Sequence, residues 1–550
     1  MEASPTQVIN FFNGFKQSVI PLFQRPYEWA QKNWQTLWDD VFERYEADSK
    51  VEHFLGAIVT SPAKSVPVGV SKFLVIDGQQ RLTTLAILLC AIRDSLPAEA
   101  KPERNRIGRH YLVNEDYEGW DHFKLLPTQP DRAGFDALVR NGEPVPSRMR
   151  DAYEFFVARI SEKDSEGNQI DPVRLLETVE HRLMVVSINL GDTDDPYLIF
   201  ESLNFKGSPL TQADLVRNYF LMRFRVDEQQ AIYDTLWLPM QERLGDHITE
   251  FMRVHLMQDG EEVSKSEVYS VLKRRLQELE SPGIRDELLR MHDMSQLYLR
   301  LVEPSRESDI ALRKRLERLT KFEVATSYPF LVKAYTRYRL GKISATTLDA
   351  FMEIIESYAV RRFFCEVPTN QLKRIYLGLA KAYIDQDPAW LSSQLSSGAH
   401  GRRWPKDDEF KAAWRNFAVY FRRDRCRLVL EALETAHKHK EPADCKDATI
   451  EHVLPQSMET WWSTHLGDNA DITHEQAAHT IGNLTLTAYN PELSNSSFPE
   501  KQKLFAGSHI SLNAYFAKAQ SWRKAEIVER ADSLFDLALR LWPRPEGTSA

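Results

Sequence analysis

The chain has 550 residues, 43% hydrophobic and 27% charged, which is ordinary for a soluble globular protein of about two to four domains. Its formal net charge of −9 excludes a protein that coats DNA passively, so we expect DNA contact only at local basic patches. No apolar run is long enough to span a bilayer, and the first residues lack the basic and apolar regions of a signal peptide. The cysteines, at positions 90, 365, 426 and 445, have no paired spacing, which argues against a zinc site or disulfide framework and favours a reducing cytoplasmic setting.

The first informative segment, residues 21–29, begins with a proline and has a second proline at position 26. Proline disfavours helix at the residue before it, so the segment is predicted to be extended. Gln24 and Arg25 lie on it, with Tyr27 and Trp29 beside them. The alternative is a hydrophobic strand that enters a core, with Arg25 at its rim.

Strands are predicted at residues 53–61 and 73–76, and the second leads directly into Asp77-Gly78-Gln79-Gln80-Arg81-Leu82-Thr83-Thr84. A helix follows, because leucines recur on one face from Leu82 onward. Strand, tight turn and helix together offer free N–H groups and a positive helix end to an anion. Gly78 would let the backbone approach a phosphate closely, and the planar guanidinium of Arg81 is suited to bind a phosphate with two N–H groups. A Walker-type motif is absent. The structural alternative for Arg81 is an ion pair with Asp77.

Another buried strand is predicted at residues 183–190. A helix over residues 197–207 would end at a glycine, and Thr211 would cap the next helix. The face of that second helix carries Asp214, Arg217 and Asn218. These polar residues form either a solvated face or part of a ligand site.

Residues 225–440 are predicted to form successive helices. Leucines at 312, 316 and 319 share a face, and four basic residues at 313, 314, 315 and 318 lie opposite, as a solvated surface or as the lining of a DNA groove. Basic clusters at 361–362, 402–403 and 422–427 are interleaved with aromatic residues, which suits a nucleic-acid channel.

The C-terminal stretch places Glu451 and His452 at the end of an apolar strand, and a proline at position 455 prevents a helix there. Asn483 begins a short alternating run predicted to be the returning strand, and Asn490 and Asn495 precede a helical pattern. His452 is suited to take a proton from an attacking water, and Glu451 and an Asn carbonyl are hard oxygen donors suited to Mg²⁺. The alternative is a chance Glu-His pair with Asn residues that cap turns.

This stretch resembles the HNH, or ββα-metal, nuclease fold, and most of all the C-terminal nuclease domain of GmrSD-type, modification-dependent (type IV) restriction endonucleases. The resemblance implies that His452 is the general base, that Glu451 and Asn490 bind Mg²⁺ or Mn²⁺, and that Asn483 braces the loop carrying His452. Many HNH enzymes have Asp where this chain has Glu451. Asn495 is a further candidate ligand.

The pieces 21–29, 77–84 and 200–218 resemble the N-terminal domain of the same family, a fold related to ParB and sulfiredoxin. The resemblance implies a nucleoside triphosphate site formed by Asp77, Gly78, Gln79, Gln80, Arg81 and Thr83, with Gln24, Arg25 and Asn204. Where the family usually has Asn-x-Arg-Gly, this chain has Lys after Asn204-Phe205, which keeps the charge and loses the planar fork.

We therefore expect a predominantly helical α+β protein with a nucleotide-hydrolysing domain at 1–225, a helical region at 226–435 and an HNH domain at 436–550. Its expected function is nucleotide-regulated, metal-dependent cleavage of DNA in anti-phage defence, in response to a DNA modification sensed near Tyr27 and Trp29. Two alternatives remain: a ParB-like DNA-binding regulator with an inactive nuclease, and an RNA-cleaving abortive toxin. The expected partners are DNA, a nucleoside triphosphate and no membrane, with a homo-oligomer as an open option.

Overall fold

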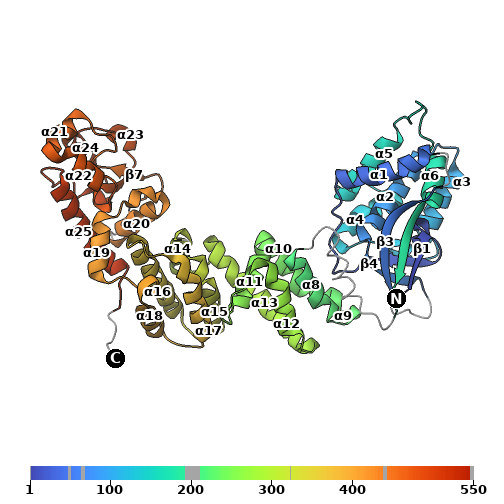
Figure 1. The fold of residues 1–550 in the computed structure, drawn as a ribbon, viewed down its shortest axis with the longest axis horizontal. Coiled ribbons are helices and arrows are strands. Elements are labelled where there is room, and N and C mark those ends of the chain that lie inside the picture. Colours follow the sequence, from blue (N-terminus) through green and yellow to red (C-terminus); the bar gives the residue numbers. More distant parts are fainter. Residues whose placement is uncertain are drawn as a thin grey trace. The chain divides into compact units, whose positions relative to one another are not determined.

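The computed structural model describes residues 2–47, 51–63, 69–191, 211–322, 324–437 and 443–545 (Figure 1). These residues form a mostly helical α+β fold with a mixed six-stranded sheet and a separate two-stranded sheet, which confirms the predicted fold class. The specific relations to ParB and to HNH nucleases stay predictions.

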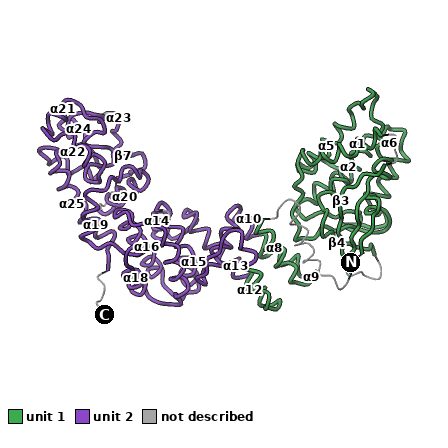
Figure 2. The backbone as a smooth tube through the Cα atoms, in the orientation of Figure 1, with its two compact units in different colours: residues 1–238, 272–288 green, residues 239–271, 289–550 purple. Residues whose placement is uncertain are grey.

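The chain divides into two compact units, one of residues 1–238 and 272–288 and the other of residues 239–271 and 289–550 (Figure 2). The predicted boundary at residue 225 lies near the end of the first segment of unit 1, and the predicted boundary at residue 435 lies inside unit 2. The three-domain division stays a prediction.

Unit 1 holds the six-stranded sheet, whose strand order is β1-β6-β3-β4-β2-β5. The β1–β6 and β3–β4 pairs are antiparallel, whereas β3–β6, β2–β4 and β2–β5 are parallel. The predicted strands at 53–61, 73–76 and 183–190 are confirmed as β3, β4 and β6. The strand bounds are β1 Glu2–Gln7, β2 Lys16–Val19, β3 His53–Pro62, β4 Ser71–Asp77, β5 Leu125–Leu126 and β6 Leu183–Asn189.

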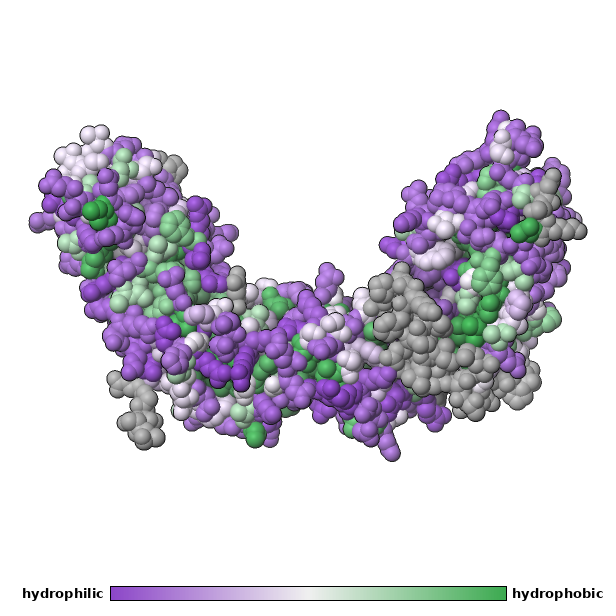
Figure 3. Space-filling view, in the orientation of Figure 1, coloured by the Kyte–Doolittle hydropathy of each residue, from purple (hydrophilic) through white to green (hydrophobic). Residues whose placement is uncertain are grey.

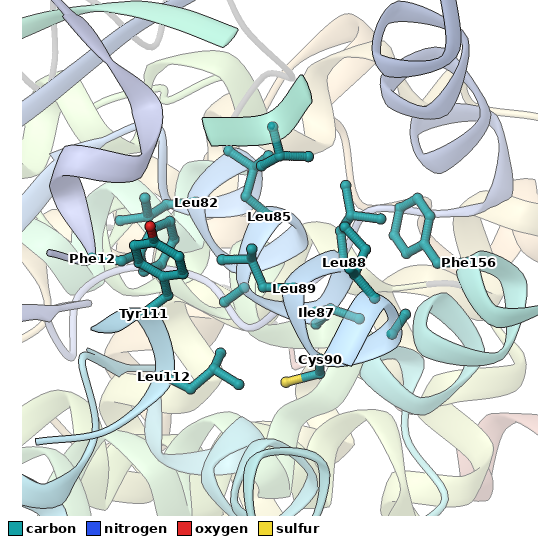
Figure 4. Close-up of a cluster of buried hydrophobic side chains, with 14 of the residues drawn as sticks. Phe12, Leu82, Leu85, Ile87, Leu88, Leu89, Cys90, Tyr111, Leu112 and Phe156 are labelled. Carbon is teal, nitrogen blue, oxygen red and sulfur yellow. The ribbon is translucent and has the colours of Figure 1, made fainter. Parts of the chain in front are cut away.

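Helix α2 is the centre of the core of unit 1, because its side chains are buried on nearly every face from Leu82 to Arg93. Such a helix is apolar all round rather than amphipathic. It contacts α5 and α6, and its leucines meet Phe12, Tyr111 and Phe156 in one cluster (Figure 4). The helices of unit 1 are α1 Gln31–Glu46, α2 Gln79–Ser95, α3 Lys101–Ile107, α4 Arg132–Arg140, α5 Arg148–Ile160, α6 Pro172–Arg182, α8 Gln212–Met222 and α9 Val226–Ile232.

The described residues between 225 and 437 form successive helices, as predicted for residues 225–440. Helices α10 Leu238–Leu244, α12 Val268–Leu276 and α13 Ser281–Val302 have residues in both units. The other helices before the sheet are α11 Ile248–Met257, α14 Ile310–Lys321, α15 Tyr328–Arg339, α16 Ala345–Phe364, α17 Leu372–Ala382, α18 Pro388–Ser396, α19 Asp407–Asn416 and α20 Arg423–Ala436.

The two-stranded sheet pairs β7 Thr449–His452 with β8 Leu484–Thr487 in antiparallel register, so the predicted returning strand is confirmed. A separate core of buried residues, including Val453, Trp462, Phe498 and Trp522, packs around this part. The remaining helices are α21 Thr460–Leu466, α22 Ala470–Ala477, α23 Asn490–Leu493, α24 Phe498–Ala506 and α25 Lys524–Leu541.

Hydrophilic residues cover most of the visible surface of each unit (Figure 3). Within the described part of the chain, every helix is too short or too polar to cross a membrane.

Candidate functional sites

The C-terminal site is built on the end of β7, where Glu451 and His452 are both almost fully buried. The ammonium of Lys501, on α24, donates to Glu451 Oε1 over 2.6 Å and to the carbonyl of His452 over 2.8 Å. Burial raises the pKa of Glu451, although the charge of Lys501 acts in the opposite direction. Lys501 therefore fixes the strand end that carries both candidate residues.

His452 is surrounded by other rings. Its Nε2 lies 3.2 Å from Nδ1 of His479, and the Tyr420 ring meets it edge-on at a centroid distance of 4.1 Å. Burial, then His479 and Lys501, lower the pKa of His452 to about 3, so its imidazole is neutral at pH 7. If Nε2 carries the proton and donates to His479, then Nδ1 is the nitrogen able to accept a proton.

Asn483 is fully buried, and its side chain forms four hydrogen bonds. Its Oδ1 accepts from the Leu454 amide at 2.7 Å and from Trp522 Nε1 at 2.9 Å, and its Nδ2 donates to the carbonyls of Leu454 and Ala478. These contacts hold the backbone two residues after His452, where a bracing residue is expected. Its effect on catalysis stays a prediction.

Asn490, the first residue of α23, bonds to the start of β7. Its Nδ2 donates to Thr449 Oγ1 at 2.9 Å and to the Ile450 carbonyl at 3.2 Å. These bonds do not use Oδ1, which is the atom that would bind a metal ion. Asn495 instead donates to Glu459 Oε1, on the segment before α21. Asn490 is therefore tied to the strand of Glu451.

Glu451 and Asn490 carry the ligand types that a hard divalent ion prefers, because Mg²⁺ binds through one or two carboxylate or amide oxygens and keeps several waters. Glu451 Oε1 is engaged by the Lys501 ammonium, and metal binding by Glu451 and Asn490 stays a prediction. A zinc site needs three or four protein ligands, and no cluster of three His, Cys, Asp or Glu side chains suited to a metal occurs among the described residues.

The N-terminal turn follows β4 as predicted. Gly78 has φ +89°, a left-handed conformation, and immediately precedes α2. A Cβ at Gly78 would lie 3.2 Å from the Ala57 carbonyl, so glycine is required for both conformation and space. Arg81 donates to that same carbonyl at 2.8 Å and forms no ion pair with Asp77, although Asp77 raises its pKa against the effect of burial.

The structure brings this turn together with residues 21–29. Gln80 Oε1 accepts from the amides of Glu28 and Trp29, and its Nε2 donates to the Pro26 carbonyl. Gln79 donates to the Arg25 carbonyl, and Gln24 donates to the Ile76 carbonyl of β4. Both amide atoms of Gln80 are thus engaged, which gives Gln80 a positioning role and leaves ligand contact by it a prediction.

The other residues predicted to bind the nucleotide are buried, ion-paired or outside the described residues. Thr83 is buried within α2, and its neighbour Thr84 makes the hydrogen bonds in this region. Arg25 is paired with Glu28 at 3.0 Å. Asn204 lies outside the described residues.

The predicted mark-sensing surface at Tyr27 and Trp29 needs a correction. Tyr27 is buried, its hydroxyl is bonded to Thr84 and to Trp34 Nε1, and its amide donates to Asp131. Trp29 is half-buried against the core of unit 1. Tyr27 is therefore a core residue rather than part of an exposed aromatic surface, because three polar partners hold it inside.

The predicted basic cluster at 361–362 also needs correction, and part of the basic surface elsewhere is ion-paired. Arg361 and Arg362 are buried and donate to backbone carbonyls, including those of Trp542 and Pro368, and Arg403 is paired with Glu409. On α14, Arg315 and Arg318 are paired with Glu356. Arg361 and Arg362 therefore stabilise the helical region from inside and are not available to a nucleic acid, whereas Arg402 is exposed.

Three residues at these sites were not singled out as candidates from the sequence: Lys501, His479 and Tyr420. A lysine on an apolar helical face next to Phe498 and Phe505 is a usable signal for a buried partner, and His479 is a second imidazole in the motif itself. Asn218 is buried in α8 with neither amide atom hydrogen-bonded in the described structure, beside Arg217, which donates to the Phe23 carbonyl. A buried polar group without partners marks a place for water or a ligand.

Two family models match separate parts of the chain. The model of the GmrSD restriction endonuclease N-terminal domain matches residues 8–221, and that of the GmrSD restriction endonuclease C-terminal domain matches residues 404–537. The chain belongs to the GmrSD restriction endonuclease family. The N-terminal GmrSD match contains the Gly78 turn and Asn218, and the C-terminal match contains Tyr420, His452 and Lys501. No curated protein sequence matches the chain.

Proposed function

We propose that the chain is a metal-dependent DNA endonuclease whose C-terminal site hydrolyses phosphodiester bonds. One observation carries the proposal: a neutral imidazole, His452, is held at a strand end beside Glu451. Membership of a restriction endonuclease family makes DNA the expected substrate.

Each of these residues has a separate role in the proposed reaction. In the tautomer whose Nε2–H donates to His479, His452 Nδ1 takes the proton from the attacking water. Asn483 holds the loop after His452, and Lys501 holds the strand end. Glu451 and Asn490 would hold Mg²⁺ or Mn²⁺, which when bound neutralises charge that develops on the phosphate.

A plasmid-nicking assay beside an RNA-degradation assay tests this function and its rivals. DNA cleavage that requires Mg²⁺ or Mn²⁺ and His452 supports the endonuclease. RNA cleavage alone identifies a toxin. DNA binding with neither kind of cleavage identifies a regulator with an inactive nuclease.

We further propose that unit 1 binds and hydrolyses a nucleoside triphosphate at the Gly78 turn, and that this step gates or powers the nuclease. Support comes from the left-handed Gly78, which places the first N–H groups of the 17-residue helix α2 and the Arg81 guanidinium at one turn. Phosphate release from each ribonucleoside triphosphate, with and without DNA, is the measurement. Arg81→Ala should reduce release, whereas Arg109→Ala, at an exposed arginine of the same unit, should not.

Cleavage in response to a DNA modification is the final part of the proposal. It rests on the resemblance to modification-dependent enzymes, and the sequence holds no evident base-reading module that would restrain the nuclease. Phage plating with matched modified and unmodified genomes tests it. Equal restriction of both genomes, with and without host modification genes, would reject modification dependence and leave the nuclease intact.

A further inference from the structure

The third basic cluster differs from the other two because its first residues are exposed and lie beside the candidate catalytic histidine. A short 3-10 turn, Val419–Phe421, leads into α20, which begins at Arg423. Arg422 and Arg423 are exposed, and Phe421 is 62% exposed. We call Phe421, Arg422 and Arg423 the turn platform.

The turn platform is fixed to the His452 site by several contacts. The Tyr420 amide donates to the His479 carbonyl at 3.3 Å, and the Phe421 ring lies 4.5 Å from the His479 ring. Tyr420 meets His452 edge-on, and the Arg423 guanidinium lies over the Tyr420 ring at 5.1 Å. The exposed side chains are thus carried by a turn that packs directly on both imidazoles.

The charges of the platform are uncompensated by partners. Neither the Arg422 nor the Arg423 guanidinium forms an ion pair with any residue that the structure describes, whereas Arg427, one turn further along α20, is paired with Glu431. An exposed phenylalanine alone is common on protein surfaces and indicates nothing. Here it adjoins two unpaired guanidinium groups and a candidate general base.

We propose that the turn platform binds the DNA strand next to the phosphate cleaved at His452. Arg422 and Arg423 contact backbone phosphates, since guanidinium groups match phosphate geometry. Phe421 stacks on a base of the same strand, as aromatic residues do in proteins that bind single strands. The inference rests on the proposed DNA endonuclease function and adds to it the residues that hold the substrate.

Binding measured without catalysis tests the platform. Fluorescence anisotropy with the full chain in EDTA, at several salt concentrations, gives the affinity for a labelled single strand and for the matching duplex. The variants are Phe421→Ala, Arg422→Ala/Arg423→Ala, and Arg402→Ala as a control at an exposed arginine of another basic cluster.

The two kinds of side chain predict different results. Loss of both arginines should reduce the magnitude of the negative slope of log K against log salt, by about 0.7 per lost contact for the single strand and about 0.9 per lost contact for the duplex. Phe421→Ala should weaken single-strand binding about five- to a hundredfold with the slope unchanged. Arg402→Ala should leave affinity and slope close to wild type.

The inference and the proposed function fail in different ways. Wild-type affinity and slope in both platform variants, or an equal loss in Arg402→Ala, would overturn the platform even if the enzyme cuts DNA. A protein that binds neither the labelled single strand nor the duplex would overturn it as well. Platform-dependent binding without His452-dependent cleavage would support the platform and reject the endonuclease.

Discussion

Lys501 and Glu451 form a buried ion pair, with Nζ 2.6 Å from Oε1 and the lysine fully inaccessible to solvent. The same ammonium also bonds to the His452 carbonyl. Removing one partner of a buried pair leaves an uncompensated charge, which costs about 3–5 kcal/mol. The pair therefore links the stability of the strand end to the position of the candidate catalytic residues.

Lys501→Met should lower the free energy of opening of β7 by about 3–5 kcal/mol, because Glu451 remains buried without its cation. Hydrogen exchange of the β7 amides at increasing urea concentration measures this energy. Lys503→Met, at an exposed lysine of the same helix, should change it by about 0.5 kcal/mol or less. Equal values for the two variants would show that the pair contributes little.

Asn483→Ala should destabilise the region around β7 and β8 by at least about 2 kcal/mol, because the groups of Leu454, Ala478 and Trp522 lose their partner inside the protein. Exchange protection of the Leu454 amide is the direct readout. Asn495→Ala serves as the control, since Asn495 has one hydrogen bond, to Glu459. Unchanged protection at Leu454 in Asn483→Ala would contradict the bracing role.

Gly78→Ala and Gly14→Ala form a matched pair. Both glycines have φ near +90°, so alanine costs about 1–2 kcal/mol at either position through backbone strain. Only at Gly78 does the added Cβ also meet Ala57 and Ile58, whereas nothing lies within 4 Å at Gly14. Gly78→Ala should therefore lower the thermal stability of unit 1 more than Gly14→Ala does, and it should also weaken nucleotide binding. Equal effects at both positions would remove the case for close packing at the turn.

Gln80→Ala should release the segment that carries Glu28 and Trp29, because the Gln80 side-chain oxygen is the acceptor for both amides. Hydrogen exchange at these two amides should become faster. Gln35→Ala, which removes a half-buried glutamine of α1 that bonds to Asp39 rather than to this segment, should leave them unchanged. Faster exchange in neither variant would mean that Gln80 does not hold the segment.

Local patterns in the sequence predict much of this structure, since strand, turn and helix at residues 71–95 follow from a hydrophobic run, a glycine and periodic leucines. The β7–β8 pair follows in the same way. Burial of single side chains could not be predicted, because it depends on tertiary partners far along the chain. Tyr27 is buried by Thr84 and Asp131, and Arg361 by Trp542 and Asp407. The Lys501 contact with Glu451 joins residues 50 positions apart, so the motif alone does not show it.

The central claim is that His452 is the general base of a DNA endonuclease. The most direct test is the single-turnover cleavage rate of plasmid DNA by wild type and His452→Ala, with Mg²⁺ or Mn²⁺ and enzyme in excess. The variant should keep the wild-type hydrogen-exchange pattern of β7 and β8 and cleave about 10²–10⁴-fold more slowly. Equal rates in the two proteins would contradict the claim.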